Sequence, residues 1–512
     1  MTATFTEKEE KMKLLTTTTT LLSLAWIFGY GTATAQEYHV STVQEIQTAL
    51  DASQNDPAND TILVEPKTYS LGRPLTYTSD EGMGSLTIKS ADPGRQVILD
   101  AQRCCPILQI DTDHNHNYTG DEGVTIRLEN ISFHNGANDS GLYVKAGGAS
   151  VFLKSLQFEG NSTEHSGGGA ILDLAAGDVR VEQTIFRNNN AKYDGGGLYV
   201  STDGKVILSA STFQNNSCER IGGGAYVANV NTSKEMTISH NLFSGNRAFN
   251  SGNFFAGGGG LFSFKKYGRA TVNANRFLDN MAYSQFNTSW GGGAYFDRNA
   301  LVTNNIFSDN TADNGGGALC YVYDLDDIVS FVNNTFLKNS GRNSGGGLQA
   351  TLHSDDSLVE IGNNIFYNNY APPLYQGDDL YVDADHNNNS TGGKVDLMHN
   401  IFETHTDFDT ALSEDLFITQ ADHYVHSDNI TGDPLLKSNG YLRRGSPAIN
   451  AGICGKWVEY PGMRFYHRIA PVDDIDGDRR PGYGVVMGCD IGADEYKKFP
   501  WPMFLPALIT PK

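Results

Sequence analysis

The sequence predicts an all-β fold, a parallel β-helix solenoid of roughly ten or more coils with an N-terminal helical cap. One phrase recurs in fixed order: a Phe, an Asn three residues later, a polar loop, three glycines and a short strand, as in FRNNNAKYDGGGLYV at Phe186–Val200. Such repetition is the signature of stacked supersecondary units. The segments VRVEQTIF and LVEIGNNIF alternate polar and apolar residues and are rich in β-branched side chains, which indicates strands rather than helices.

Residues 1–35 are predicted to be a signal peptide. Lys11 and Lys13 precede the apolar stretch Leu21–Tyr30, and the small residues Ala33-Thr34-Ala35 then form a cleavage site. We expect cleavage near Ala35 and a secreted or cell-surface location, with no transmembrane segment apart from the signal. The alternative is an uncleaved anchor, but the apolar run is too short to span a bilayer.

Residues 36–123 are predicted to form the N-terminal cap and the first coils. Val43, Ile46 and Leu50 fall on one face of a short amphipathic helix, which would cover the open end of the stack as solenoids require. The segments TILVEP, SLTIKS and QVILDAQ follow as strands, because they carry β-branched residues with turn residues between them.

Residues 124–405 are predicted to be the β-helix repeat region. Its repeats vary in length: Phe133 and Phe158 are 25 residues apart, and Phe366 and Phe402 are 36 apart. We expect the phenylalanines to stack inside the coils and the asparagines to form hydrogen-bonded ladders at the turns. The glycines supply unusual φ values and a close approach of the backbone to the next coil.

Residues 406–496 are predicted to hold the C-terminal coils and a further segment of different composition, followed by an apolar, Pro-rich tail at residues 497–512. The tail is either an attachment tail or a segment packed on the last coil. In an oxidising compartment, Cys454 and Cys489 share this region and are the expected disulfide. Cys218 and Cys320 lie inside repeats, where we expect buried free thiols.

The paired motifs F-x-x-N and GG[A/L] resemble the repeats of chlamydial polymorphic outer-membrane proteins. The stack more broadly resembles the right-handed, pectin-lyase-like β-helix class. The segment DPLLKSNGYLRRGSPAINAG resembles the choice-of-anchor segment of exported bacterial β-helix proteins. These resemblances imply the fold and a location at the cell surface. They do not imply one activity, because β-helices host lyases, hydrolases, adhesins and inert scaffolds.

The formal net charge of −22 argues against nucleic acid or an anionic membrane as a partner. It also disfavours a polyanionic glycan, unless calcium or a local basic patch offsets the repulsion.

The second residue after each glycine triplet is predicted to face solvent, because the residues on either side of it are small or apolar. This position forms a column along the axis: Tyr143, Ile171, Tyr199, Tyr226, Phe262, Tyr295, Leu319, Gln349 and Tyr381. An exposed aromatic column is a platform for the flat faces of a sugar chain. Two neighbouring coils also carry long loops, in which Phe254 and Trp290 lie. The candidate ligand-binding residues are therefore Tyr199, Tyr226, Phe262, Tyr295, Phe254 and Trp290. The alternative is that the loops cover the column and make it a second packing layer.

Carboxylates form the second candidate site. Asp326 and Asp327 lie in one coil, and Asp355 and Asp356 in the next, since the separation of 29 between Asp326 and Asp355 equals one repeat. Four close carboxylates repel one another unless they share a cation, and oxygen ligands suit calcium. The alternative is a set of solvated acidic turns and no cofactor. Asp474, Asp476 and Asp478 have the spacing of the start of a calcium loop, but the later positions do not fit an EF-hand.

The leading hypothesis is an exported or cell-surface protein that binds polysaccharide or another surface without catalysis. The alternative is a polysaccharide lyase, pectate-lyase-like and calcium-dependent, or a glycoside hydrolase of the pectin-lyase-like class. The hydrolase motifs G-H-G and N-T-D are missing, and no catalytic residue is assigned. A third hypothesis is a passive structural spacer.

Overall fold

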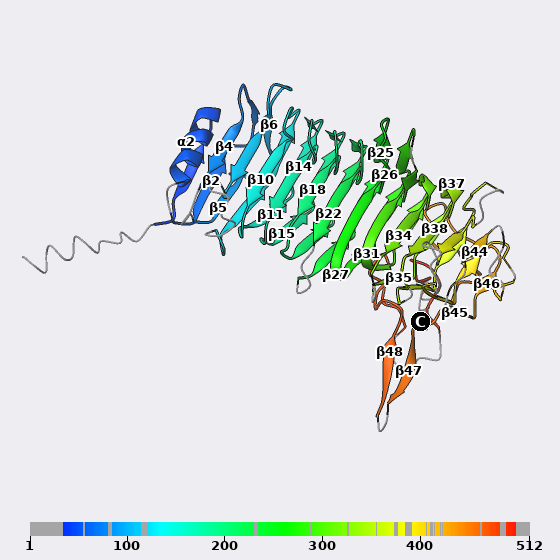
Figure 1. The fold of residues 1–512 in the computed structure, drawn as a ribbon. Coiled ribbons are helices and arrows are strands. Elements are labelled where there is room, and N and C mark those ends of the chain that lie inside the picture. Colours follow the sequence, from blue (N-terminus) through cyan, green and yellow to red (C-terminus); the bar gives the residue numbers. More distant parts are fainter. Residues whose placement is uncertain are drawn as a thin grey trace, which may run out of the picture.

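The computed structural model describes residues 34–497 except 55–56, 80–83, 114–120, 230–233, 287, 325–326, 355, 373–376, 385–391, 406, 410–412, 414, 420, 422, 461–462 and 482–487. The predicted signal peptide and Pro-rich tail lie outside the described residues, apart from residues 34, 35 and 497. The chain winds into a parallel β-helix of about 11 turns, with a short helix at its N-terminal end (Figure 1). The predicted fold class is confirmed.

The helix α2 (Val43–Ser53) covers the open end of the stack. Thr42 caps its N-terminus: the Glu45 backbone N–H donates to Thr42 Oγ1 at 3.2 Å, and Glu45 Oε2 accepts from the Thr42 backbone N–H at 3.1 Å. Ile46 and Leu50 are 2% and 0% exposed, so the predicted apolar face is buried against the first coils.

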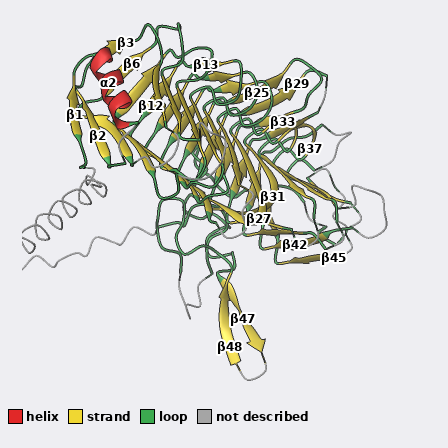
Figure 2. Ribbon diagram, turned by 60° about the vertical axis from the view of Figure 1, so that its left-hand side comes forward, coloured by secondary structure: helices red, strands yellow, loops and turns green. Residues whose placement is uncertain are grey.

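Most coils contribute one strand to each of two long parallel ladders, which run along the β-helix (Figure 2). Ladder 1 contains the strands that follow the glycine triplets and their counterparts in the other coils: β4 (Leu75–Thr78), β7 (Leu108–Asp111), β10 (Leu142–Ala146), β14 (Ala170–Leu174), β18 (Leu198–Ser201), β22 (Ala225–Asn229), β27 (Leu261–Asn273), β31 (Ala294–Thr303), β34 (Ala318–Val322), β38 (Leu348–Leu352), β41 (Leu380–Asp383) and β44 (Leu416–Ile418). Ladder 2 contains β1 (Glu37–Val40), β2 (Asp60–Val64), β5 (Leu86–Ser90), β8 (Thr125–Glu129), β11 (Ser150–Lys154), β15 (Val179–Glu182), β19 (Val206–Ser209), β23 (Met236–Ser239), β35 (Ile328–Val332), β39 (Leu358–Gly362), β42 (Lys394–Met398) and β45 (His423–Ser427). The long strands β27 and β31 run through the corner and belong to both ladders.

Two shorter parallel sheets complete each coil. Sheet B carries the phenylalanines: β3 (Thr68–Ser70), β6 (Val97–Asp100), β9 (Ile131–His134), β12 (Gln157–Glu159), β16 (Ile185–Arg187), β20 (Thr212–Gln214), β24 (Leu242–Ser244), β28 (Arg276–Leu278), β32 (Ile306–Ser308), β36 (Thr335–Leu337), β40 (Ile365–Tyr367), β43 (Ile401–Phe402) and β46 (Ile430–Thr431). Sheet C follows the asparagine turns: β13 (Ser162–Thr163), β17 (Asn190–Ala191), β21 (Ser217–Cys218), β25 (Arg247–Asn250), β26 (Ala256–Gly257), β29 (Met281–Ser284), β30 (Ser289–Trp290), β33 (Thr311–Asn314) and β37 (Ser340–Ser344).

The repeated Phe and Asn residues hold the coils in register. From Phe133 to Phe402 the rings stack face to face, with centroids 4.7 to 5.1 Å apart. Beside them each asparagine amide donates to the next coil; for example, Asn189 Nδ2 donates to Asn216 Oδ1 at 3.0 Å and to the Phe158 carbonyl at 2.9 Å. Both predictions are confirmed, and together they satisfy buried polar groups where the chain leaves the sheet.

The glycine triplets let the chain re-enter ladder 1 at close range. The first glycine adopts a left-handed conformation, with φ +67° at Gly195. A Cβ at the second, Gly196, would clash with the carbonyl oxygen of Gly223 in the next coil. The two predicted roles, an unusual φ and a close approach to the next coil, therefore belong to different glycines of the triplet.

The last segment of the chain folds back over sheet B. We call residues 433–497, as far as they are described, the C-terminal clasp. Three asparagines at the corner before sheet B donate to clasp carbonyls: Asn304 to Asp473 at 2.8 Å, Asn333 to Asp490 at 2.9 Å and Asn363 to Ile453 at 2.8 Å. Apolar side chains seal the contact in two clusters, one with Ile365, Ile401, Leu442, Ala448 and Ile491, and the other with Ala274, Ile306, Ile475 and Ala493.

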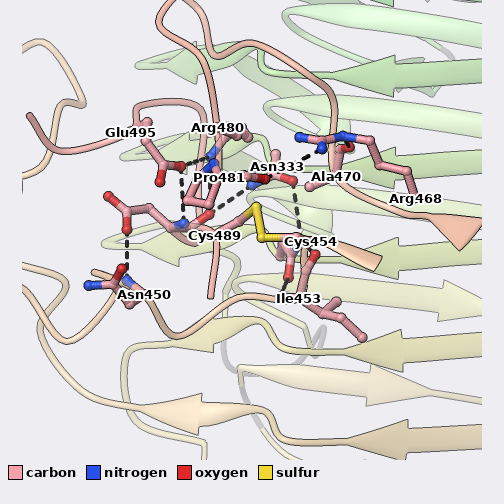
Figure 3. Close-up of a disulfide and its surroundings, with 12 residues drawn as sticks. Asn333, Asn450, Ile453, Cys454, Arg468, Ala470, Arg480, Pro481, Cys489 and Glu495 are labelled. Atoms are coloured by element: carbon pink, nitrogen blue, oxygen red, sulfur yellow. Dashed lines mark hydrogen bonds and ion pairs between the residues drawn. A yellow bond between two sulfur atoms is a disulfide. The ribbon is translucent and has the colours of Figure 1, made fainter. Parts of the chain in front are cut away.

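A buried ion pair and a disulfide hold the clasp together (Figure 3). The Arg480 side chain is fully buried and donates to Glu495 at 2.7 Å and to the Gly492 carbonyl at 2.9 Å. Cys454 and Cys489 form the predicted disulfide, with their Cα atoms 5.1 Å apart. Cys218 and Cys320 are buried free thiols, as expected. The antiparallel hairpin β47 (Gly455–Tyr460) and β48 (Met463–Arg468) projects away from the stack (Figures 1 and 2).

Candidate functional site

The aromatic column forms on the outer face of ladder 1, in the predicted register. Tyr199, Tyr226, Phe262 and Tyr295 are direct neighbours on β18, β22, β27 and β31. The rings of Tyr199 and Tyr226 stack at 4.7 Å, and those of Tyr226 and Phe262 at 4.9 Å. Tyr199 and Tyr226 are half-buried, so this part of the column reaches the surface.

The long loops cover the column over the next two coils. Phe262 and Tyr295 are only 4% and 3% exposed, so the prediction that they face solvent is wrong. The physical reason is that Phe255 and Trp290 stack on each other at 4.7 Å and Trp290 meets the Tyr295 ring edge-on at 5.8 Å. The alternative of a second packing layer therefore holds there, because the loops bury their own aromatic side chains against the column.

Phe254 takes the opposite direction from its neighbour in the loop. Its side chain is 64% exposed, and the Arg220 guanidinium lies 5.9 Å from its ring centroid. Trp290 is partly buried under the loops. These two candidate residues therefore do not face a common cavity with Tyr199.

Where the covered and open parts of ladder 1 meet, the surface is hollowed into a groove of about 540 Å³. We call it the ladder groove. Its lining residues come from β14, β18, β22, β27, β31 and the turns after them: Leu174, Ala175, Ser201, Thr202, Asp203, Tyr226, Ala228, Phe262, Phe264 and Asp297. The small residues Ser201 and Ala228 leave space beside the Phe264 ring, which lies next in the same register.

Asp297 gives the ladder groove a carboxyl in an unusual state. Burial raises the pKa of Asp297 to about 6, and the nearby Arg298 guanidinium only partly offsets this effect. Asp297 Oδ1 is buried and has no hydrogen-bond partner. A carboxyl with such a pKa can serve as a proton donor or as a partner for a cation.

Arg298 turns away from the groove. It forms ion pairs with Asp324 and, at 3.8 Å, with Asp327. Its guanidinium lies 5.5 Å from the Tyr323 ring centroid and 6.0 Å from that of Phe264. Its charge is therefore used in holding the turn after ladder 1.

The structure describes only half of the predicted calcium cluster. Asp326 and Asp355 lie outside the described residues. Asp327 pairs with Arg298, and Asp356 pairs with Lys394 at 2.9 Å, so each of these carboxylates already has a cationic partner. Among the described residues, no group of three or more His, Cys, Asp or Glu side chains is arranged to hold a metal ion.

The second acidic motif is structural in the clasp. Asp474 Oδ1 accepts from the backbone N–H groups of Asp476 at 2.9 Å and of Asp478 at 2.7 Å. Asp474 Oδ2 accepts from the Glu495 N–H at 2.9 Å. The 1-3-5 spacing here therefore closes a turn and fixes it to the end of the clasp.

Sequence reasoning missed four lining residues that share one face with the column. Ser201, Ala228, Phe264 and Asp297 each lie two residues after a column residue, and side chains two apart on a strand share a face. The two-residue period of a strand could therefore have placed these residues beside the column. Asp203 lies in the turn after β18 and follows no such pattern.

Two family models match parts of the chain. Residues 115–301 match the right-handed β-helix region, and residues 306–321 match the Chlamydia polymorphic membrane protein repeat. This is a right-handed β-helix protein. The predicted resemblance to these repeats is confirmed, whereas no curated protein matches the chain. In the part of this β-helix protein that the structure describes, no helix is long and apolar enough to cross a membrane.

Solved structures of polysaccharide lyases show low similarity to this β-helix protein. A family 6 polysaccharide lyase from Pseudopedobacter saltans is 11% identical, with a TM-score of 0.32, over 78% of this chain and 94% of that one. A mannuronic-acid-specific family 6 lyase from human gut microbiota is 12% identical, with a TM-score of 0.35, over 78% and 88%. A family 6 alginate lyase in complex with a trisaccharide is 12% identical, with a TM-score of 0.27, over 86% and 93%. These values are too low to extend the activity of those enzymes to this chain.

Proposed function

We propose that this protein is exported or displayed at the cell surface, where its β-helix binds polysaccharide along the ladder groove without cutting it. The observation that carries the proposal is the groove itself, about 540 Å³ in volume and lined by Tyr226, Phe262 and Phe264. Tyr226 is stacked between Tyr199 and Phe262, so the edge of its ring, together with the partly exposed Phe264, provides the apolar surface for the C–H groups of sugar rings. Ser201 and Asp203 add polar groups for sugar hydroxyls.

The direction of the groove also supports a chain-like ligand. It crosses from β14 to β31, along the axis of the stack, where each coil advances about 4.8 Å. That advance is close to the rise of one pyranose in an extended chain. Successive sugars would therefore meet successive coils.

The surface location rests on sequence features. The Chlamydia polymorphic membrane protein repeat at residues 306–321 is a hint of a surface protein. The signal peptide predicted at residues 1–35 lies almost wholly outside the described residues. The resemblance of the C-terminal region to choice-of-anchor segments supports attachment of the protein to a surface.

Affinity electrophoresis in gels containing neutral, basic or acidic polysaccharides tests the proposal. We expect at least one polysaccharide to retard the native protein, and Tyr226→Ala to weaken the retardation about tenfold, because about 1.4 kcal/mol is expected for one aromatic contact. Tyr381→Ala is the matched control, since Tyr381 is a half-buried member of the same column that does not line the groove. Equal retardation of the two variants, with folding checked by circular dichroism, would remove the groove as the binding site. Asp203→Asn provides a second variant that leaves the packing intact.

One observation favours a second candidate function, hydrolysis of a glycosidic bond. A carboxyl with a pKa of about 6 is suited to general acid catalysis, and Asp203 supplies a second carboxyl in the same groove. Release of reducing ends that stops with Asp297→Asn would replace the non-catalytic proposal. The calcium-dependent lyase alternative depends on Asp326 and Asp355, and the same assay with calcium and with a chelator tests it.

A further inference from the structure

The charged groups that line the ladder groove are all acidic. Asp203 and Asp297 lie along its wall, and no Lys, Arg or His is among the described residues that line it. A groove that accepts an acidic sugar chain normally offers cations to it, because like charges repel in a partly desolvated site. The negative charge of the lining residues would therefore repel a uronate.

The neighbouring cations are turned to other partners. Arg298 pairs with Asp324 and Asp327 and lies between the Phe264 and Tyr323 rings. Lys265 is 1% exposed and donates to Asn229 Oδ1 and, at 2.9 Å, to the Lys234 carbonyl. Each cation is thus held by ion pairs or hydrogen bonds, and the Lys265 ammonium also lies near enough to Asp203 for the two charges to attract.

Asp297 is the group that a ligand would satisfy. Its Oδ1 atom is buried without a hydrogen-bond partner, although it belongs to a residue that lines the groove. Burial without a partner is costly for a carboxylate, and this cost is the reason for its raised pKa. A cationic donor arriving in the groove would remove that cost.

We propose that the ladder groove selects a polysaccharide of amino sugars, whose protonated amines pair with Asp297 and Asp203 while the rings pack against Tyr226 and Phe264. This inference rests on the proposed binding function and names its ligand class. The small side chains of Ser201 and Ala228 leave room for the sugar ring beside Phe264. The amine brings a positive charge to the groove side of Asp297, which offsets the cost of its buried carboxylate.

Isothermal titration with oligosaccharides of equal length tests the selectivity. The probes are a glucosamine oligomer, the same oligomer fully N-acetylated, and a galacturonate oligomer, at a pH just above 6, where more than half of the Asp297 carboxyl groups are ionised. We expect the glucosamine oligomer to bind about tenfold more tightly than its N-acetylated counterpart, and the galacturonate oligomer to bind most weakly. Equal binding of the first two would overturn the selectivity and leave the proposed function standing. Binding of none of the three would instead overturn the proposed function.

Two variants separate the carboxylate from general charge. Asp297→Asn is expected to lower the affinity for the glucosamine oligomer to that of the N-acetylated one and to leave the latter unchanged. Asp409→Asn removes the same charge from a side chain that is 90% exposed outside the groove, and we expect no change. Equal losses in both variants would mean that net charge alone attracts the sugar, which contradicts the proposal. An oligolysine of equal charge is the last probe, and binding as tight as that of the glucosamine oligomer would overturn sugar recognition.

Discussion

Asp379 closes one of the asparagine ladders with a carboxyl. It stands where other coils have the third glycine of the triplet, opposite Gly347 of the preceding coil. The last amide of the ladder, Asn369 Nδ2, donates to Asp379 Oδ1 at 2.9 Å, while Asp379 Oδ2 has no partner. Burial raises the pKa of Asp379 well above its usual value. The ladder therefore ends on a group that the fold prefers in its protonated form.

We predict that Asp379→Asn stabilises the protein at neutral pH by on the order of 1 kcal/mol. Because the pKa is raised in the folded state, the native protein holds a proton that the unfolded chain loses near pH 3.9. The contribution of Asp379 to the stability is therefore greatest below that pH and falls as the pH rises towards the folded pKa. Chemical denaturation at several pH values measures the difference, which should shrink as the pH approaches 4. A constant difference would contradict the role of protonation.

At the residue scale the sequence was sufficient wherever one position repeats. The residue types of Phe186 and Asn189 recur at the same positions through most of the repeat region, so a single local rule predicted both stacks. The exposure of Tyr295 was not predictable in this way, because it depends on how the Phe255 and Trp290 loops fold. The raised pKa of Asp297 results from burial of its carboxyl, and the sequence pattern alone does not predict that burial.

At the scale of elements the C-terminal clasp differs from the rest of the chain. A strand of the solenoid contacts the strands of adjacent coils. The clasp has no repeat of its own, although Asn304, Asn333 and Asn363, which bind it, occupy one repeated position of the coils. The hydrogen bond from Asn333 to Asp490 joins residues 157 positions apart, and the one from Arg480 to Asn304 joins residues 176 positions apart. Because the clasp residues themselves follow no period, the sequence predicted the disulfide but not the surface that the segment covers.

We predict that Cys454→Ser loosens the clasp without disturbing the repeats. The disulfide joins residues separated by 35 positions, and closing a loop of that length is worth about 3–4 kcal/mol. Hydrogen exchange should accelerate across residues 433–497 and at Asn333, while the amides of β14 to β22 keep their protection. Cys218→Ser, which removes a free thiol, is the control. Faster exchange throughout the repeat region would show instead that the disulfide stabilises the whole stack.

At the scale of the whole molecule the clasp adds long-range coupling to a nearest-neighbour architecture. Solenoid coils ordinarily stabilise only their neighbours, and unfolding starts at an end. Here Tyr441 contacts Arg276 on β28, while Leu442 and Ile491 pack in one cluster with Ile401 on β43. The boundary predicted near residue 406 stays a prediction, and these contacts cross it. The coils from β28 to β43 thus share one covering segment.

We predict that Arg480→Met makes the unfolding of those coils less cooperative. Loss of one partner of a buried ion pair costs about 3–5 kcal/mol, and Glu495, whose pKa burial raises to about 7, would then take up a proton near neutral pH. Calorimetry should resolve a separate early transition for the C-terminal coils. The double variant Arg480→Met/Glu495→Gln should recover part of the loss. One unchanged transition in the single variant would contradict the coupling.

The return of the clasp over sheet B also determines how the molecule would carry mechanical load. A force applied at residue 497 does not first reach the final coil, β44 to β46, because the clasp is bonded to the earlier coils that contain β32 and β36. Those bonds lie across several coils and would be loaded together, in shear, rather than peeled one after another. A protein tethered at its C-terminal end would therefore resist pulling through the coils beneath the clasp, and the final coil would be spared.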